Sequence, residues 1–291
     1  MKRRTALSLT GGMLAAPMLI GVPALAADLA ERRLSTIELR TGGRLGVAVH
    51  DTASGRRLGY REHERFPMCS TFKALLVAAV LRRVEQGSER LDRRIDYGEG
   101  DLLEYAPVTR DHVAEGSMSV EALCAAAIEF SDNTAANLLL ASIGGPEGYT
   151  RFTRTLGDQV TRLDRTETAL NTALPGDPRD TTTPAAAIAD LQHVLSGPAL
   201  LRPSQLRLQG WMDGCKTGTA RLRAGLPRSW TVGDKTGTGE RGTANDIAIA
   251  RPFGRRPVFI ACYLTGATSI SGDQRDAAIA DVGRIVGEVL R

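Results

Sequence analysis

The chain has 291 residues, with 37 basic and 33 acidic side chains, a formal charge of +4 and 42% hydrophobic residues. This proportion of apolar side chains is sufficient for a packed core, which excludes disorder along most of the chain. The surplus of basic residues invites a nucleic-acid hypothesis, which requires those residues to cluster on one face or stripe.

The first basic cluster is at the start of the chain. Basic residues at positions 2–4 precede an apolar stretch without acidic residues that ends in Ala24 and Ala26. This layout is typical of an export signal, and we expect residues 1–26 to be cleaved. Cleavage lowers the formal charge from +4 to +1, which removes the argument for a nucleic-acid partner. We expect a periplasmic or secreted protein, exported by the Sec or twin-arginine route, with no stable membrane anchor.

The first half of the chain predicts few strands. An amphipathic charged pattern predicts a helix over residues 28–40, and two short strands are expected over 45–50 and 57–60. Over residues 66–214 we find helix-like runs separated by turn residues and no sustained period-two alternation. This region is therefore predicted to be all-helical.

Strand patterns return in the last third of the chain. They cover residues 230–234, 245–250 and 258–265, and a final helix is expected over 274–290. The order predicts an α+β fold, in which a five-stranded antiparallel sheet flanked by terminal helices is interrupted by an inserted all-helical domain. The predicted domains are an α/β domain of residues 27–65 and 215–291 and an all-helical domain of residues 66–214.

The first candidate catalytic motif lies at the start of a helix. The run from Met68 to Leu81 is apolar on all sides, which is typical of a buried helix, and Lys73 is the exception. Lys73 follows Ser70 by one turn on the same face, and burial lowers the pKa of a lysine, so it could act as a base for that serine. The alternative is a serine N-cap followed by a lysine that extends to solvent, which is more common for a lone Ser-x-x-Lys.

Two further polar motifs follow. Ser131-Asp132-Asn133 interrupts a helical stretch and alone is an ordinary turn or N-cap signal. Lys235-Thr236-Gly237 has strand on both sides and can therefore place a cation and a backbone N–H group rigidly beside a site. A second Lys-Thr-Gly sequence, Lys216-Thr217-Gly218, follows the end of a helix. We interpret it as a loop that does not contribute to the site.

The three motifs and their order resemble the motif set of the class A serine β-lactamases, a family of penicillin-recognising serine hydrolases. The motifs are Ser70-x-x-Lys73, Ser131-Asp132-Asn133 and Lys235-Thr236-Gly237. The resemblance extends from about residue 28 to the C-terminus. It includes residues 162–180, which are similar to the Ω-shaped active-site loop of that family. Each motif is weak alone, but the ordered set is specific.

The resemblance implies β-lactam resistance through hydrolysis of penicillins and cephalosporins, with an acyl-enzyme on Ser70. The serine proton would go to Lys73, or to Glu167 through a water, and the sequence leaves both routes open. Ser131 would pass a proton to the departing nitrogen, and Glu167 would activate the water that hydrolyses the acyl-enzyme. The N–H groups of Ser70 and Thr238 would form the oxyanion hole.

The resemblance also implies a substrate-binding set, which comprises Tyr105, Asn133, Asn171, Arg221, Lys235, Thr236 and Thr238. Many relatives carry an arginine on the strand after Lys-Thr-Gly, where this chain has Ala244, and we expect Arg221 to replace it. Arg165 and Asp180 would clamp the Ω-shaped loop, the alternative being a surface ion pair of little energy. No cofactor or metal is implied, the expected partners are small-molecule β-lactam antibiotics, and we expect a monomer.

Two positions depart from the family pattern. Thr168 follows Glu167 where relatives often have a proline with a cis bond. Class A carbapenemases typically bridge the cysteine before the nucleophile to one just after Lys-Thr-Gly. Here Cys69 is present but the partner position is Gly239, so we do not expect efficient carbapenem hydrolysis. The cysteine spacing supports neither a zinc site nor a redox pair, and buried free thiols are the better interpretation.

Rival hypotheses remain at this point. D-Ala-D-Ala peptidases of the penicillin-binding class share the three motifs but lack the loop that carries Glu167. A non-catalytic β-lactam sensor or peptidoglycan-binding module would bind or become acylated and stop. A Ser-His-Asp hydrolase and a metallo-hydrolase lack their Gly-x-Ser-x-Gly and His-Glu-x-x-His signatures here. Structural or surface roles are expected for the histidines His50, His63, His112 and His193.

Overall fold

The computed structural model describes residues 22–290. Most of the expected export signal, residues 1–21, lies outside them. Within the described part, no helix combines the length and hydropathy that a membrane span requires.

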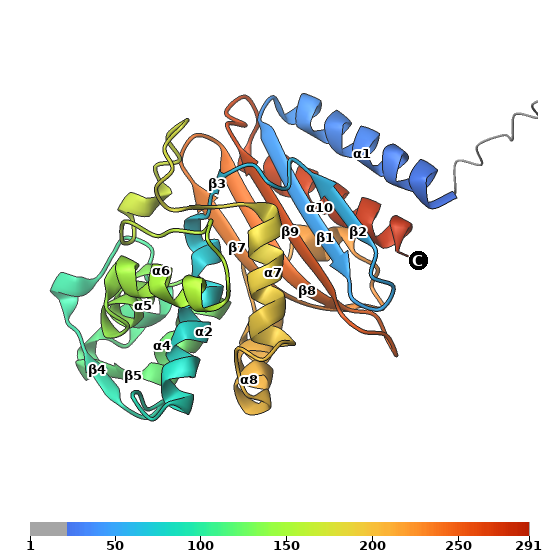
Figure 1. Cartoon of the computed structure of the whole chain (residues 1–291). Helices are drawn as coiled ribbons and strands as arrows, with labels where there is room; N and C mark the ends of the chain where they lie inside the picture. Colours follow the sequence, from blue (N-terminus) through green and yellow to red (C-terminus); the bar gives the residue numbers. More distant parts are fainter. Residues whose placement is uncertain (1–21, 291) are drawn as a thin grey trace, which may run out of the picture.

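A five-stranded antiparallel sheet forms the centre of the molecule, in the order β2-β1-β9-β8-β7 (Figure 1). Its strands are β1 (Arg44–Asp51), β2 (Arg57–Tyr60), β7 (Thr231–Gly239), β8 (Thr243–Arg251) and β9 (Val258–Thr265). The predicted sheet is confirmed, and β7 and β8 are longer than expected. The extension arises because the Lys-Thr-Gly motif continues the ladder, with Lys235 opposite Ile247 and Gly237 opposite Asn245.

The two terminal helices pack on one face of the sheet, and the remaining large helices lie on the other side (Figure 1). The terminal helices are α1 (Val22–Thr41) and α10 (Gly272–Val289), and α10 begins with a capping box between Ser271 and Gln274. The others are α2 (Phe72–Glu85), α3 (Pro107–Asp111), α4 (Val120–Glu129), α5 (Asn133–Ser142), α6 (Gly145–Thr155), α7 (Pro184–Leu195) and α8 (Arg202–Asp213). The short helix α9 (Leu222–Gly225) packs against α10 on the side of the terminal helices.

The sheet separates two hydrophobic clusters. Successive residues of β9 alternate between them, since strand side chains point to opposite faces. Phe259 and Tyr263 belong to the helical-side cluster, which also includes Phe72, whereas Ile260 and Leu264 belong to the terminal-helix cluster. The sheet therefore contributes to both cores.

The region 66–214 also contains two small antiparallel pairs that the sequence did not predict. β3 (Phe66–Pro67) pairs with β6 (Thr181–Thr182), and β4 (Arg94–Asp96) pairs with β5 (Ser117–Ser119). Strands of two or three residues are too short to produce a detectable alternation. The β3–β6 pair brings the end of the Ω-shaped loop next to the start of α2. The domain boundaries themselves stay a prediction.

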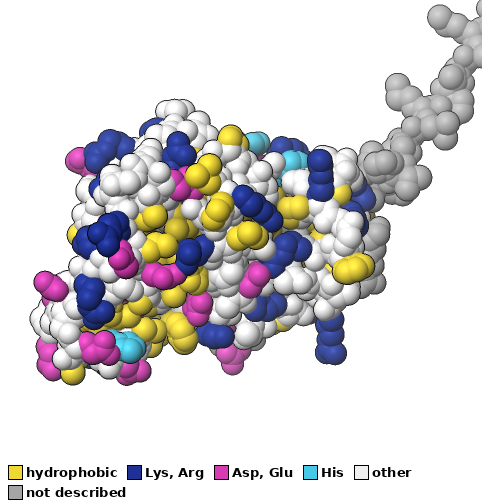
Figure 2. All heavy atoms as spheres, turned by 90° about the horizontal axis from the view of Figure 1, so that it is seen from below, with side chains coloured by type: hydrophobic (Ala, Val, Ile, Leu, Met, Phe, Trp, Pro, Cys, Tyr) yellow, Lys and Arg dark blue, Asp and Glu magenta, His cyan; other side chains and the backbone are white. Residues whose placement is uncertain are grey.

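The surface seen from below carries basic, acidic and hydrophobic side chains in mixture (Figure 2). Basic groups on this face are interspersed with acidic ones. No continuous stripe of one charge covers it.

Candidate active site

The candidate nucleophile lies in a tight turn at the start of α2. Cys69–Thr71 form a single 3₁₀ turn, and Cys69 has a φ of +45°. Strand β7 packs against this turn, where a Cβ on Gly237 would lie only 2.7 Å from the carbonyl oxygen of Met68. Glycine is therefore required for the close approach that places Ser70 beside the Lys-Thr-Gly strand.

Lys73 is completely buried, so the alternative of a lysine that extends to solvent is wrong. Its Nζ lies 3.0 Å from Glu167 Oε1 and donates to Asn133 Oδ1 at 2.6 Å and to the Ser131 carbonyl at 2.8 Å. Ser70 Oγ donates to the same Glu167 oxygen at 3.1 Å. Burial lowers the pKa of Lys73, although the Glu167 carboxylate acts in the opposite direction.

The hydroxyl of Ser131 lies between two lysines. It accepts from Lys235 Nζ at 3.0 Å and lies 3.5 Å from Lys73 Nζ. Burial, followed by the charge of Lys73, lowers the pKa of Lys235 to about 8. Asp132 caps the next helix by accepting from the Ala135 N–H at 2.8 Å.

Glu167 is held by two asparagines. Asn137 pins its backbone by accepting from the Glu167 N–H at 3.0 Å and donating to the Glu167 carbonyl at 2.9 Å. Asn171 Nδ2 donates to Glu167 Oε2 at 2.6 Å. The Glu167–Thr168 peptide bond is cis. Together these contacts direct the carboxylate toward Ser70.

The Arg165–Asp180 clamp is buried at its acidic end. Asp180 Oδ2 accepts from Arg165 Nε at 2.5 Å, and Oδ1 accepts from the backbone N–H groups of Asp164 and Arg165. The Asp180 carbonyl accepts from Met68 N at 2.9 Å, which ties the loop to the nucleophile turn. Asp180 has no exposed surface, so the alternative of a surface ion pair is wrong.

Arg221 is brought to the Lys-Thr-Gly strand. Its Nη1 donates to the carbonyls of Gly237 and Asn245, both at 2.8 Å, and its Nη2 donates to Thr238 Oγ1 at 2.8 Å. Asp276 accepts from Nε at 2.7 Å. The guanidinium is thus fixed behind the Thr238 hydroxyl and supplies positive charge there.

Tyr105 differs from the other predicted site residues because half of its surface is exposed. Its backbone carbonyl accepts from the Asn133 N–H at 3.0 Å, which places the tyrosine at the margin of the cluster. No hydrogen bond links its side chain to the catalytic group among residues 22–290. The structure therefore brings the other predicted residues together and leaves Tyr105 at the rim.

The second Lys-Thr-Gly sequence, at residues 216–218, was interpreted as a loop away from the site, but it lies directly against the site. Thr217 Oγ1 is 2.5 Å from Thr236 Oγ1, and a Cβ on Gly218 would lie 1.7 Å from Asp234 Oδ2. Sequence reasoning also missed Asn137. Its position one turn after Asn133 on the same helix was the available signal.

All four cysteines are buried free thiols, as expected. Burial raises the pKa of the Cys69 thiol far above its usual range. A Cβ at Gly239 would lie 2.6 Å from Cys69 Sγ, so the two positions are adjacent although no bridge joins them. Within the described residues, no group of three or more His, Cys, Asp or Glu side chains is arranged to hold a metal ion.

The comparisons with known proteins agree with this geometry. The sequence profile of the Beta-lactamase enzyme family matches residues 29–290. Beta-lactamase CTX-M-97 of Escherichia coli is 46% identical over 87% of each chain, and Beta-lactamase L2 of Stenotrophomonas maltophilia is 48% identical over 92% of this chain and 88% of its own. Among solved structures, an ancestral class A β-lactamase is 60% identical, with a TM-score of 0.87, over 89% of this chain and 99% of its own. The putative class A β-lactamase PenP of Rhodopseudomonas palustris is 55% identical, with a TM-score of 0.87, over 90% of this chain and 99% of its own.

Proposed function

The chain belongs to the class A serine β-lactamase family and hydrolyses β-lactam antibiotics, and on this premise we propose that Ser70, Lys73, Ser131 and Glu167 carry out the reaction. The observation that carries the proposal is the shared Glu167 oxygen, which accepts from Ser70 Oγ at 3.1 Å and lies 3.0 Å from Lys73 Nζ. A nucleophile and a candidate base are thus in contact.

In acylation, Ser70 Oγ bonds to the lactam carbonyl carbon and the ring C–N bond breaks. Ser70 donates to Glu167, and residues 22–290 contain no direct hydrogen bond from Ser70 to Lys73, which supports Glu167 as the proton acceptor. The nitrogen that leaves takes a proton from Ser131, and Glu167 returns its proton to Ser131 through Lys73, whose Nζ lies 3.0 Å from Glu167 Oε1 and 3.5 Å from Ser131 Oγ. Glu167 is therefore a carboxylate again once the acyl-enzyme has formed. The N–H groups of Ser70 and Thr238 stabilise the oxyanion, and each donor of this kind contributes about 2.7–4 kcal/mol.

In deacylation, a water attacks the ester carbonyl and gives its proton to Glu167. The ester bond breaks, and Ser70 recovers a proton. Asn171 donates to one oxygen of Glu167 at 2.6 Å, which leaves the other oxygen directed at the nucleophile. This is the step that distinguishes a β-lactamase from a penicillin-binding peptidase.

Penicillins and cephalosporins share a carboxylate, and we assign its recognition to Lys235, Thr236 and Thr238 with Arg221 behind them. Lys235 is completely buried, which strengthens its attraction for an anion. Asn133 binds the substrate side-chain amide, and Tyr105 forms the wall of the entrance. The basic, acid-free start of the chain supports cleavage of residues 1–26 and action outside the cytoplasm.

The test is turnover of a chromogenic cephalosporin, combined with intact-mass spectra of the protein. Wild type should turn the substrate over, and Ser70→Ala should form no adduct. Glu167→Gln should form the acyl adduct more slowly than wild type, because it lacks the proton acceptor of acylation, and should then retain it, with deacylation about 10²- to 10⁴-fold slower. Glu99→Gln, an exposed control, should behave like wild type. A stable adduct on wild type without turnover would indicate a peptidase or sensor, and an adduct on Ser70→Ala would exclude Ser70 as the nucleophile.

A further inference from the structure

A cavity of about 520 Å³ lies between the Ω-shaped loop and one end of the central sheet. Its wall is formed by the start of β1, by β3, by the outer part of the loop and by the turn between β7 and β8. Neither Ser70 nor Glu167 lines it. Its charged lining comprises five arginines and one acid: Arg44, Arg65, Arg165, Arg179, Arg241 and Asp177.

Three of these arginines have carboxylate partners. Arg44 Nη1 lies 3.0 Å from Glu64, Arg179 Nη2 lies 2.8 Å from Asp177, and Arg165 is the clamp residue described above. Their charges are compensated within the protein. They form the wall of the cavity without adding free positive charge.

The other two arginines are uncompensated. Arg65 Nη1 donates to the Val160 carbonyl at 2.9 Å and to Thr181 Oγ1 at 3.0 Å, and both acceptors are neutral. The Arg241 guanidinium has no hydrogen bond or ion pair with any of residues 22–290. The cavity thus has two guanidinium groups whose charge no carboxylate of the described chain balances.

These two arginines are connected through the end of the sheet. Arg44 pairs with Thr265 in the β1–β9 ladder, and its Nη2 donates to the Arg65 carbonyl at 2.7 Å. The next residue, Gly266, donates its N–H to the Arg241 carbonyl at 3.0 Å. The positions of Arg65 and Arg241 are therefore set by the same rigid ladder.

Arg241 has an unusual backbone conformation. It has a φ of +53° and is followed by Gly242 at +65°, so two successive residues of the β7–β8 turn are left-handed. Hairpin turns of this kind favour Asn, Asp or Gly at both positions, and an arginine there costs backbone strain. Strain that other residue types would relieve is often retained for function.

We propose that this cavity binds a small polyanion that carries at least two phosphate or carboxylate groups, held by Arg65 and Arg241. Guanidinium groups bind both anions through paired N–H donors, and a cavity of this size accommodates a ligand larger than a single phosphate. The inference concerns binding and does not depend on the catalytic roles assigned to Ser70 and Glu167.

The experiment is isothermal titration calorimetry of the folded protein at low ionic strength, with inorganic pyrophosphate in one arm and citrate in the other. Wild type should bind at least one of these probes with saturation at one site, and the arm that binds identifies phosphate or carboxylate as the ligand group. Arg241→Gln and Arg65→Gln should each weaken that binding about tenfold or more, since each removes a charged donor. Arg241→Gln breaks no side-chain hydrogen bond or ion pair among residues 22–290, so the variant should keep the wild-type melting temperature. It therefore still tests the proposal if Arg65→Gln is unstable.

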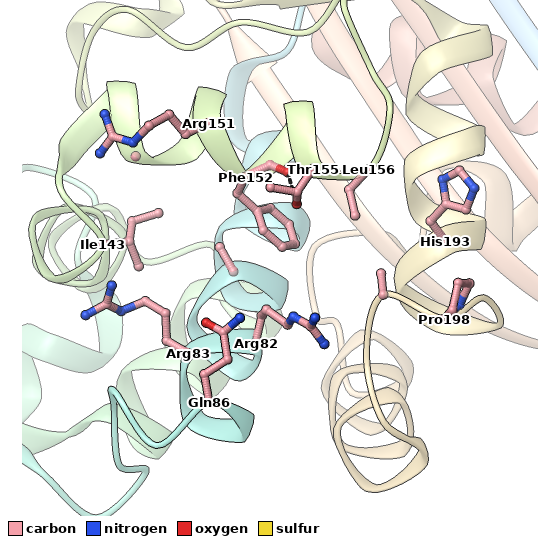
Figure 3. Close-up of a pocket in the computed structure, with 13 residues that line it drawn as sticks. Arg82, Arg83, Gln86, Ile143, Arg151, Phe152, Thr155, Leu156, His193 and Pro198 are labelled. Atoms are coloured by element: carbon pink, nitrogen blue, oxygen red, sulfur yellow. Dashed lines mark hydrogen bonds between the residues drawn. The ribbon is translucent and has the colours of Figure 1, made fainter.

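Arg151→Gln provides a matched control. Arg151 lines a different cavity of about 530 Å³ on the helical side, together with Arg82, Arg83 and Phe152 (Figure 3). Its removal should leave binding unchanged. Lys235→Gln should also leave it unchanged, because the proposed site is separate from the substrate carboxylate site. The proposal is overturned if neither probe binds, if Arg241→Gln binds like wild type, or if binding is lost in Lys235→Gln or Arg151→Gln.

Discussion

Two lysines define the electrostatics of the catalytic cluster. The chain has only four lysines against 33 arginines, and Lys73 and Lys235 are both completely buried at the site. An arginine would remain charged there, whereas burial and mutual repulsion make an amine easier to deprotonate. The site therefore contains a cation, Lys235, whose charge depends on pH near 8.

Lys235 should produce an alkaline limit in substrate capture. Its pKa in the free enzyme is lowered to about 8, so the ammonium is present below that pH and is lost as the pH rises through it. We expect kcat/KM for a penicillin to fall above about pH 8, mainly through KM, because the charge that binds the carboxylate disappears. Steady-state kinetics from pH 6 to 10 measure this dependence.

The control for this prediction is Lys235→Arg, which keeps its charge over the whole range. Its kcat/KM should lack the alkaline decline, whatever its absolute value. An unchanged decline in that variant would assign the limit to another group.

Residue spacing predicted much of the site, but not all of it. Ser70 and Lys73 are one turn apart, so helix geometry alone brings them together. The contact between Thr217 and Thr236 depends on how a loop folds back on a strand, and no local pattern encodes it. The same is true of Arg221, whose approach to Thr238 is set by the backbone carbonyls of two strands.

At the scale of elements, α7 supports the segment that leads into the Ω-shaped loop. Asp190 of α7 is buried and hydrogen-bonded to Asp158, whose carboxylate accepts from the N–H groups of Val160 and Thr161. Burial, and then the charge of Asp158, raises the pKa of Asp190 to about 9. This carboxyl group therefore carries a proton at neutral pH and donates it to its neighbour.

Asp190→Asn should stabilise the protein at alkaline pH. A carboxyl with a raised pKa in the folded state contributes stability below its unfolded pKa, near 4, and this contribution is lost as the pH rises toward 9. The loss amounts to about 1.4 kcal/mol per pH unit at most, and an amide, which donates at every pH, avoids it. Urea denaturation at pH 5.5 and pH 8 measures the free energy of unfolding of both proteins. The value for the variant minus the value for wild type should be about 3 kcal/mol larger at pH 8 than at pH 5.5.

Asp111→Asn, at an exposed position, is the matched control and should show no such gain. Equal differences between Asp190→Asn and wild type at both pH values would mean that Asp190 is already ionised in the folded protein.

The elements themselves were largely predictable because their patterns are long. The apolar runs of α2 and β9 lie in elements of 14 and 8 residues. The β3–β6 and β4–β5 pairs were missed because two or three residues carry no period, and their pairing depends on residues distant in the sequence. The strand at Lys-Thr-Gly was truncated in our prediction because glycine, aspartate and lysine have low strand propensity, which ladder pairing overrides.

At the scale of the whole molecule, the sheet joins the two hydrophobic clusters. Neither cluster can lose its sheet face without disturbing the other, because the same strands supply both. The two tryptophans report on the two sides: Trp211 packs against the helical-side cluster and Trp230 against the terminal-helix cluster.

We therefore expect both sides to unfold together. Urea denaturation of Trp211→Phe and Trp230→Phe, followed by the fluorescence of the remaining tryptophan, should give a transition that coincides with far-UV circular dichroism of the same variant. In each variant the two probes should agree. Distinct midpoints within one variant would mean that the inserted helical region unfolds independently.

Oxidants can reach the four cysteines only when the molecule opens, because all four thiols are buried. Cys124 lies in the helical-side cluster and Cys262 in the terminal-helix cluster, so their exposure requires the cores themselves to open. Their oxidation then follows the population of opened molecules. Any substitution that lowers the free energy of unfolding, however far from the active site, should shorten the chemical lifetime of the enzyme in oxidising surroundings.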